Sequence, residues 1–416
     1  MARVTDKGVA VTGVGLVTSA GADEHTFWAG LCAGRSTARR CDELAGLPVD
    51  FACPIDGIDL DRAVGGRAVW RMARFVKLAV VAARQAVADA GLSPAVWDGD
   101  RVGVVLGVGV GGISALVDNA RKFDERGPDA VSPVLVPMMM PNAAAGEVAI
   151  ALRACGPSLA PATACASGAT AIAVARDLLA SGRCDVVVAG GAESVLTPLV
   201  VTAFARAGAL STRTDDPAGA SRPFAEDRDG FVVGEGAALV VLERTADVRA
   251  RGGRSRALLT GAGSSTDAYH PTAPAPDGRG ARLAVETALG QAGWSSGDVD
   301  HVNAHGTSTR LNDAMESALI TQLFPHRPPV TAPKGVLGHT LAAAGAIEAV
   351  ATVLTLEHGV IPPVANLDSP PGGFELDCVT KEPRRRSVER AVSHSFGFGG
   401  HNVALAFQRA RPPAGS

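Results

Sequence analysis

Residues 161–168 read Pro161-Ala-Thr-Ala-Cys165-Ala-Ser-Gly168, and they connect two kinds of secondary structure. The preceding segment, residues 157–164, is small, apolar and extended in character, whereas residues 169–180 form an alanine-rich run of helical character. We therefore expect Cys165 at the N-terminus of a helix, where free N–H groups and the helix dipole favour a thiolate. The alternative is a buried structural cysteine, because free cysteines are often buried.

The change from strand to helix at Cys165 is repeated along the chain. We expect strands at residues 9–14, 102–107, 185–189, 237–243, 256–264, 299–303, 392–395 and 402–408. We expect helices at residues 69–90, 143–152, 169–181, 200–207, 279–292 and 313–323. This alternation predicts an α/β fold with a largely parallel sheet covered by helices. Residues 212–229 and 269–280 are rich in turn-forming residues and are expected to be loops at the mouth of a site.

Composition limits the class of protein. A chain of 416 residues exceeds a usual single core and suggests two domains or an internal duplication. Its net charge of -3 gives nucleic-acid binding no electrostatic support. The seven cysteines have no CxxC spacing and we recognise no secretory signal, so we expect free thiols in a reducing cytoplasm. No uninterrupted run of 18 apolar residues argues for a membrane span.

The second half of the chain contains two histidine motifs and a glycine-rich loop. His305 lies in Asn303-Ala-His-Gly-Thr-Ser-Thr309, and His339 lies in Lys334-Gly-Val-Leu-Gly-His339. A lone histidine is more often structural. Two of them in glycine-punctuated loops, together with a candidate nucleophile, fit a nucleophile-plus-base arrangement. Residues 393–402 read SHSFGFGGHN, a loop that brings backbone N–H groups close to a ligand.

Three other motifs argue less strongly for a function. Residues 107–112 match the GxGxxG dinucleotide fingerprint, but the acidic strand end that should follow is missing. Residues 293–297 match GxSxG, but they follow a helix and precede a strand, the reverse of a serine elbow. His301 and His305 are four residues apart on a strand-like segment without a third ligand, which argues against zinc.

Taken together, Cys165, His305, Lys334, His339 and the Phe-Gly loop resemble the elongating β-ketoacyl synthases of the thiolase superfamily. Further motifs follow in the family's order at residues 11–15, 185–193, 222–236 and 267–270. The resemblance is to the type II, free-standing form, because the chain ends soon after Asn402. It implies a thiolase-like five-layered αβαβα fold with two duplicated halves, residues 1–250 and 251–416, each with a mixed sheet. No direct similarity between the halves is visible in the sequence.

The resemblance also implies a reaction, a decarboxylative Claisen condensation. Cys165 would take an acyl chain from an acyl carrier protein, and the carbanion left by malonyl decarboxylation would attack the acyl-cysteine. The family pattern places backbone N–H groups of Cys165 and Phe396 at the oxyanion. His305 and His339 would donate to the enolate oxygen. Lys334, paired with Glu348, would orient the histidines.

The remaining roles concern substrate and partners. Phe396 and Phe398 would gate the acyl pocket, and Thr307 and Thr309 would bind the pantetheine amides. No metal and no cofactor are expected beyond the phosphopantetheine of the carrier protein. Three arginines have the i, i+4 and i+7 spacing of one helix face: Arg67, Arg71 and Arg74. Together with Arg206 they would dock the acidic carrier protein. The alternative for these arginines is a solvated helix face.

Several points stay open at this stage. Arg310 stands where many relatives carry proline, and Ala342 where many carry glycine. A dimer is expected through the strand around residues 186–189, with either a second copy or a chain-length-factor-like homologue. A non-catalytic partner subunit would lack the nucleophile, and a degradative thiolase would need a second catalytic cysteine, whereas Cys378 lacks a glycine-rich setting. The choice between fatty acid and polyketide synthesis is open.

Overall fold

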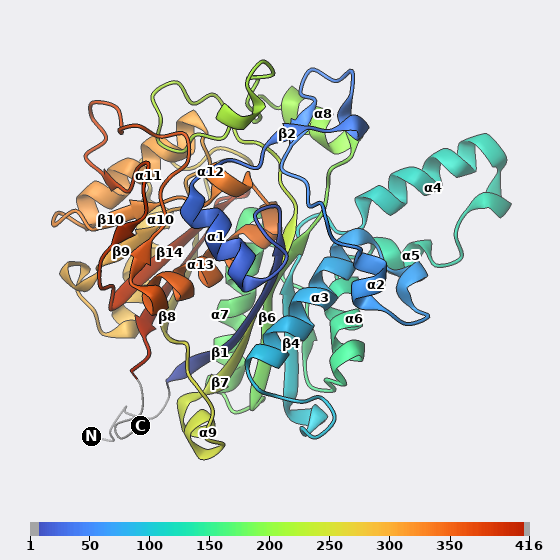
Figure 1. Ribbon diagram of the computed structural model, residues 1–416, viewed down its shortest axis with the longest axis horizontal. Coiled ribbons are helices and arrows are strands. Elements are labelled where there is room, and N and C mark those ends of the chain that lie inside the picture. Colours follow the sequence, from blue (N-terminus) through green and yellow to red (C-terminus); the bar gives the residue numbers. More distant parts are fainter. Residues whose placement is uncertain (1–7, 412–416) are drawn as a thin grey trace.

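Two half-sheets with the same strand order meet edge to edge in this structure, a computed structural model that describes residues 8–411 (Figure 1). The first half-sheet runs β1 (Val9–Thr18), β7 (Gly236–Arg244), β6 (Val186–Glu193), β4 (Val102–Gly107) and β5 (Ser158–Leu159). The second runs β8 (Ala257–Thr266), β15 (His401–Arg409), β14 (Arg390–Gly397), β9 (His301–Asn303), β10 (Pro329–Thr331) and β12 (Asp377–Cys378). Three residue pairs between β1 and β8 join them.

The two half-sheets are built alike. In the first half, β1 pairs antiparallel with β7, and β7 pairs antiparallel with β6. In the second half, β8 pairs antiparallel with β15, and β15 pairs antiparallel with β14. The inner strands β6–β4–β5 and β14–β9–β10 then run parallel to one another. The halves are therefore mixed sheets with one topology, and the duplication that the sequence does not display is present in the strand order.

Helices form the other three layers. The outer layers are α3 (Arg74–Asp89) and α6 (Ala143–Leu152) on the first half-sheet, and α10 (Arg279–Ala292) and α11 (Arg310–Leu323) on the second. The middle layer consists of α7 (Ser167–Ala180) and α13 (Ala344–His358), which pack on each other and on both half-sheets. The thiolase-like αβαβα fold expected from the resemblance is confirmed.

Paired glycines let the outer helices approach the first strand of each half. A Cβ on Gly13 would lie 2.1 Å from the Ala86 carbonyl oxygen of α3. A Cβ on Gly263 would lie 2.0 Å from the Ala284 carbonyl oxygen of α10. Any side chain at either position would push the helix off the sheet, so the same packing device serves both halves.

The two helices of the middle layer begin in the same way, and this positions the site. A short 3₁₀ turn precedes each of them, Ala164–Ala166 before α7 and Leu341–Ala343 before α13. The first residues of these turns, Ala164 and Leu341, have positive φ values of 49° and 50°. This backbone is unusual for a residue with a side chain, and it occurs at equivalent places before both helices of the middle layer. Cys165 occupies the middle of the first turn.

The remaining elements are short or peripheral. The helices are α1 (Glu24–Ala33), α2 (Leu60–Val64), α4 (Ile113–Arg126), α5 (Leu135–Met139), α8 (Pro198–Arg206), α9 (Thr245–Ala250) and α12 (Lys334–Leu337). The strands are β2 (Arg39–Arg40), β3 (Phe51–Ala52), β11 (Val360–Ile361) and β13 (Arg384–Arg385). Figure 1 shows α4 projecting away from the body of the molecule. Residues 341–358 form one helical run long and apolar enough to cross a membrane, and 89% of it is buried in the middle layer.

Most predicted elements are present, with some differences. The strand at 102–107 and the helices at 143–152 and 279–292 agree with the structure to the residue. The helix expected at 69–90 is wrong at its start, because Val69–Arg71 form a separate 3₁₀ turn and the chain extends through Met72 and Ala73 before α3. The helices α1, α4 and α5 were not expected.

Candidate active site

Cys165 lies at the base of a cavity of about 460 Å³ that opens between the two halves. The cavity wall includes most of the residues singled out from the sequence: Cys165, His305, Thr307, Thr309, His339, Phe396 and Phe398. Cys165 is 7% exposed and precedes the first turn of α7, as the sequence predicts. Segments more than two hundred residues apart in the chain therefore converge on one sulfur atom.

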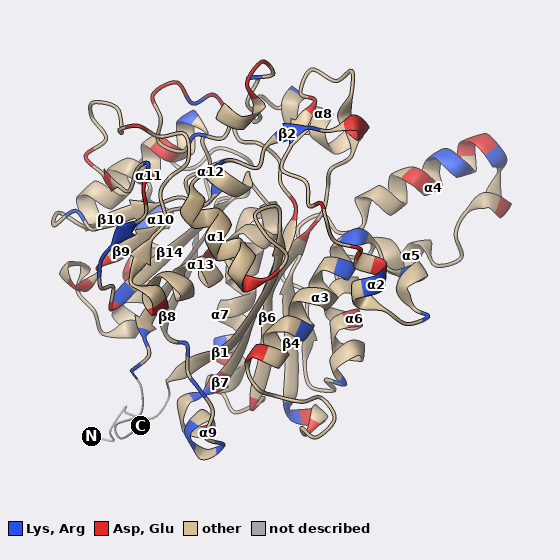
Figure 2. Cartoon of the chain, in the orientation of Figure 1, with Lys and Arg blue, Asp and Glu red and all other residues tan. Residues whose placement is uncertain are grey.

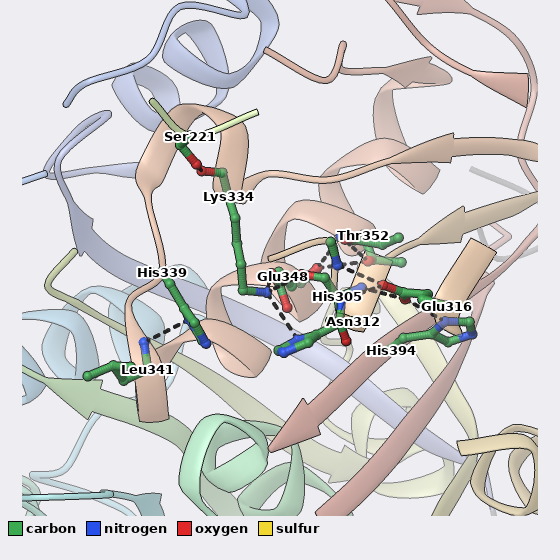
Figure 3. Close-up of polar contacts among 12 residues, drawn as sticks. Ser221, His305, Asn312, Glu316, Lys334, His339, Leu341, Glu348, Thr352 and His394 are labelled. Carbon is green, nitrogen blue, oxygen red and sulfur yellow. Dashed lines mark hydrogen bonds and ion pairs between the residues drawn. The ribbon is translucent and has the colours of Figure 1, made fainter. Parts of the chain in front are cut away.

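His305 is held by a buried lysine (Figure 3). Lys334 Nζ lies 3.2 Å from His305 Nδ1 and 2.6 Å from the His305 carbonyl oxygen, and it also forms an ion pair with Glu348. An ammonium group can only donate, so Nδ1 of His305 must accept. The ring proton is then on Nε2.

His339 is fixed in the same tautomer by the backbone. The Leu341 N–H group donates to Nδ1 of His339 at 3.2 Å, which leaves the proton on Nε2. The two imidazole rings are nearly perpendicular, with centroids 5.5 Å apart. Burial, followed by the nearby Lys334, lowers the pKa of each ring well below its usual value. Both imidazoles are therefore neutral Nε2–H donors beside one cavity.

Glu316 of α11 anchors the histidine loop, and the sequence analysis missed it. Its carboxylate accepts from the His305 and Gly306 N–H groups, each at 2.8 Å, and from His394 Nδ1 at 3.1 Å. Glu316 is fully buried, so these bonds fix the loop rigidly. The sequence signal that could have found Glu316 is an acidic residue on the helix that directly follows the glycine-containing histidine loop.

Two backbone N–H groups point toward the Cys165 thiol. Burial raises the pKa of this thiol to about 11, although Lys334, the Phe398 N–H group and its own N–H group act to lower it. It is the N–H of Phe398, rather than that of Phe396, that interacts with the sulfur. Phe396 belongs to β14, opposite Asn402 in β15, and its ring packs on His305 with centroids 5.8 Å apart.

The absence of a side chain at Gly397 allows the Phe398 N–H group to approach the Cys165 sulfur. A Cβ there would lie 2.7 Å from the Thr163 carbonyl oxygen and 3.1 Å from the Cys165 nitrogen. After Gly397, the chain turns through Gly399 and Gly400, both with positive φ. The turn brings Phe398 out of the strand and over the thiol.

The GxGxxG segment, residues 107–112, wraps a carboxylate of the protein itself. Glu193, at the end of β6, accepts from the N–H groups of Gly109 (2.9 Å), Val110 (3.0 Å) and Gly111 (3.2 Å). These are the donors that a dinucleotide phosphate would need. Burial raises the pKa of Glu193 to about 7. Glu193 also lines the cavity and is a second residue that the sequence analysis did not single out.

The predicted docking arginines do not share a helix face. Arg71 ends the 3₁₀ turn and pairs with Glu147 at 2.9 Å, whereas Arg74 begins α3 and pairs with Glu235 at 2.7 Å. Arg67, Arg74 and Arg206 are exposed, but of the set only Arg67 and Arg206 make no hydrogen bond or ion pair within residues 8–411. Figure 2 shows blue and red segments interspersed around α2 and along α4.

Two further expectations can be compared with the structure. The strand expected to pair two subunits, β6, lies between β4 and β7 and has no free edge; the free edge of this half-sheet is β5. That prediction is wrong because β6 is an interior strand. His301 is fully buried, and no group of three or more metal-ligating side chains occurs among residues 8–411.

Comparisons with known proteins agree with this geometry. Residues 6–248 match the family described as Beta-ketoacyl synthase, N-terminal domain, and residues 256–368 match Beta-ketoacyl synthase, C-terminal domain. The chain is 41% identical to 3-oxoacyl-[acyl-carrier-protein] synthase 2 of Synechocystis sp., covering 98% of this chain and 100% of that protein. It is 40% identical to the protein of that name from Rhizobium meliloti, covering 96% and 98%.

Solved structures show the same likeness. A β-ketoacyl synthase from Burkholderia phymatum superposes with a TM-score of 0.90 at 35% identity, covering 97% of this chain and all of the other. The ishigamide ketosynthase/chain length factor superposes with a TM-score of 0.92 at 33% identity, covering 98% and 100%. With Cys165, two oriented imidazoles and a buried lysine around one cavity, the chain belongs to the β-ketoacyl synthase family.

Proposed function

We propose that this chain is a 3-oxoacyl-acyl carrier protein synthase, which condenses malonyl carrier protein with an acyl chain held on Cys165. One observation carries the proposal: a buried cysteine faces two neutral imidazoles, each fixed as an Nε2–H donor by a partner on Nδ1. A hydrolase would need one of these rings as a base beside the nucleophile. Two donors side by side suit a reaction that builds negative charge on a substrate oxygen.

In the first half-reaction, Cys165 Sγ forms a bond to the carbonyl carbon of the acyl thioester. The carrier thiol leaves and takes up the proton that Cys165 gives up. The N-terminus of α7 stabilises the developing thiolate. We assign the tetrahedral oxyanion to the N–H groups of Cys165 and Phe398, in place of Phe396, because these are the backbone N–H groups that act on the Cys165 sulfur.

In the second half-reaction, the malonyl thioester loses carbon dioxide. The electron pair of the broken C–C bond becomes an enolate, whose oxygen accepts from Nε2–H of His305 and of His339. The enolate carbon attacks the acyl carbonyl and releases the Cys165 thiolate. Lys334, neutralised by Glu348, is a positioning residue because it acts through Nδ1 of His305.

The outer parts of the cavity suit the carrier-bound arm of the substrate. Thr307 and Thr309 line the cavity wall, and their hydroxyls hydrogen-bond to each other at 2.9 Å. Because both residues face the cavity, we assign their hydroxyls to the pantetheine amides. Phe398, half-buried in a glycine turn, is better placed to gate the acyl pocket than Phe396, which is fixed in β14. The mechanism uses no metal or bound cofactor. We propose a cytoplasmic location for the protein. We also propose that its two halves divide near residue 250.

A second candidate is a ketosynthase that works only with a chain-length-factor-like partner, and a surface for a dimer partner is present. The free β5 edge and the projecting α4 and α5 region expose apolar side chains: Leu116, Phe123, Val136, Met140 and Leu159. Such a surface suits a dimer partner, which is either a second copy or a homologue. One superposable structure is a ketosynthase in complex with its chain length factor.

The test is direct. The purified chain is incubated with an acyl carrier protein carrying a short acyl chain and with malonyl carrier protein, and products are followed by mass spectrometry. We expect a 3-oxoacyl carrier protein two carbons longer than the starter, with release of carbon dioxide. No product from the chain alone but product after addition of a homologous partner supports the second candidate. Hydrolysis of the acyl thioester without condensation would contradict both.

A further inference from the structure

One wall of the cavity rises from the catalytic floor to the surface along a single stretch of chain, residues 305–311. Exposure increases along it, from 2% at His305 and 6% at Thr307 to 64% at Leu311. Every residue of this stretch except Gly306 and Ser308 lines the cavity. The stretch therefore provides an ordered series of contacts, from the reacting atoms to the rim, for an extended substrate.

Arg310 is the charged residue at the upper end of this wall. It lines the cavity, is exposed, and begins α11. Its guanidinium makes no hydrogen bond or ion pair with any residue between 8 and 411. Arg206 of α8 lies between two lining residues, Phe204 and Ala207, and is likewise exposed and without a partner in this part of the chain. Arg310 is thus a free planar donor on the path that a substrate must follow.

A second arginine lies beneath it. Arg228 is 7% exposed, and its guanidinium donates to the carbonyl oxygens of Thr309 (3.2 Å) and Arg310 (3.1 Å). These bonds hold the backbone of Arg310 at the rim. Burial and the charge of Arg310 both lower the pKa of Arg228, which shows that the two cations repel each other.

Acids accompany the buried arginine. Asp313 forms an ion pair with Arg228 at 3.5 Å, and although burial raises the pKa of Asp313 to about 6, this carboxyl is mostly ionised at neutral pH and offsets Arg228. Asp229 and Asp267 also line the cavity. Arg310, without a partner among residues 8–411, is the charge at the rim that can bind an anion. Its place at the N-terminus of α11 also favours an anion.

We propose that Arg310 binds the phosphate of the substrate's phosphopantetheine arm. The proposal rests on the proposed function, and the order of contacts supports it. The thioester end of the arm meets His305, its amides meet Thr307 and Thr309, and its phosphate reaches Arg310. A guanidinium binds phosphate through two parallel N–H donors.

The experiment compares two small substrates that differ only in the phosphate, acyl-phosphopantetheine and acyl-pantetheine. The rate of Cys165 acylation is measured by intact mass at increasing substrate concentration, for the wild type, for Arg310→Gln and for Arg183→Gln. Arg183 is an exposed arginine beyond the far end of α7 from Cys165, and it serves as the matched control.

We expect the wild type and the control to require about threefold to fivefold less of the phosphorylated substrate, the scale of an exposed ion pair. Arg310→Gln should remove this preference without changing the rate on acyl-pantetheine, and high salt should reduce the preference of the wild type. A preference that survives Arg310→Gln, or an equal loss on both substrates, would overturn the assignment. Acyl carrier protein is assayed in parallel as a third donor, and a loss confined to this carrier-bound substrate would show that Arg310 contacts carrier carboxylates and would also overturn the assignment. Failure of the wild type to acylate with either substrate would instead reject the proposed function.

Discussion

Replacing Lys334 by methionine separates two roles that this residue combines. Lys334 is almost completely buried, forms an ion pair with the equally buried Glu348, and donates to Nδ1 of His305. Methionine has a similar length and no charge. The substitution therefore leaves a carboxyl group buried without its cation and removes the donor that fixes the tautomer of His305.

The two losses have different magnitudes and different readouts. Breaking a buried ion pair by removing one partner costs about 3–5 kcal/mol of stability. Burial already raises the pKa of Glu348 to about 7 against the lowering effect of Lys334, so in Lys334→Met this carboxyl should become protonated, which limits the loss. Losing one oriented donor to the enolate should slow condensation by about 100-fold.

A double variant, Lys334→Met with Glu348→Met, distinguishes the roles. Apolar replacement of both partners of a buried pair is close to neutral for stability. We expect urea unfolding to show recovered stability, while carbon dioxide release from malonyl carrier protein stays about 100-fold low. Recovery of condensation together with stability would refute the reasoning, because Lys334 would then have no role in positioning His305.

Three further predictions concern other parts of the molecule. His339→Ala should slow malonyl decarboxylation by about 100-fold or more and affect acylation of Cys165 less; equal losses in separate half-reaction assays would reject this division. Burial lowers the pKa of His301 to about 3, and its ring nitrogens make no hydrogen bond within the described residues, so His301→Leu should gain stability relative to the wild type as pH falls. Below pH 6.5 only the unfolded wild type takes up this proton, and the difference in urea unfolding should widen by about 2 kcal/mol between pH 7 and pH 5; a constant difference would be inconsistent with that pKa. Leu159→Lys places a charge on the β5 edge and should give monomers in sedimentation, whereas an unchanged dimer would show that this edge is not the interface.

The sequence predicted the fold well wherever local pattern and burial agree. The strands and helices of the layers are apolar runs of the expected period, and those at 102–107, 143–152 and 279–292 agree to the residue. The start of α3 was wrong because Met72 and Ala73 are apolar like a helix face and carry no stop signal. The helix α4 was missed because it projects from the body and has only two buried residues, Ala115 and Asn119.

The part of the candidate site that lies in motifs of glycine and other small residues could be predicted from the sequence. Cys165, His305 and His339 each stand in such a motif, and all three line the cavity. Glu316 and Glu193 were missed because each lies in an ordinary helix or strand, and only the fold shows which loop its carboxylate holds. The tautomers of the histidines were likewise beyond the sequence, since they depend on a lysine and on the Leu341 N–H group.

The placement of the predicted docking arginines on one helix face was wrong for a related reason. Spacing placed Arg71 and Arg74 on one face, but acids from distant segments, Glu147 and Glu235, pair with them in the folded protein. Pairing with acids more than 70 residues away is set by packing and leaves no local trace. The docking role itself stays a prediction for Arg67, Arg71, Arg74 and Arg206.

The central claim is that Cys165 carries the acyl chain, and one measurement tests it most directly. The protein is incubated with acyl carrier protein bearing a short acyl chain, digested under conditions that preserve thioesters, and mapped by tandem mass spectrometry. The account predicts one acyl group per chain on the peptide that contains Cys165, and none with Cys165→Ala. An acyl group on any of the other six cysteines, with Cys165 unmodified, would contradict it.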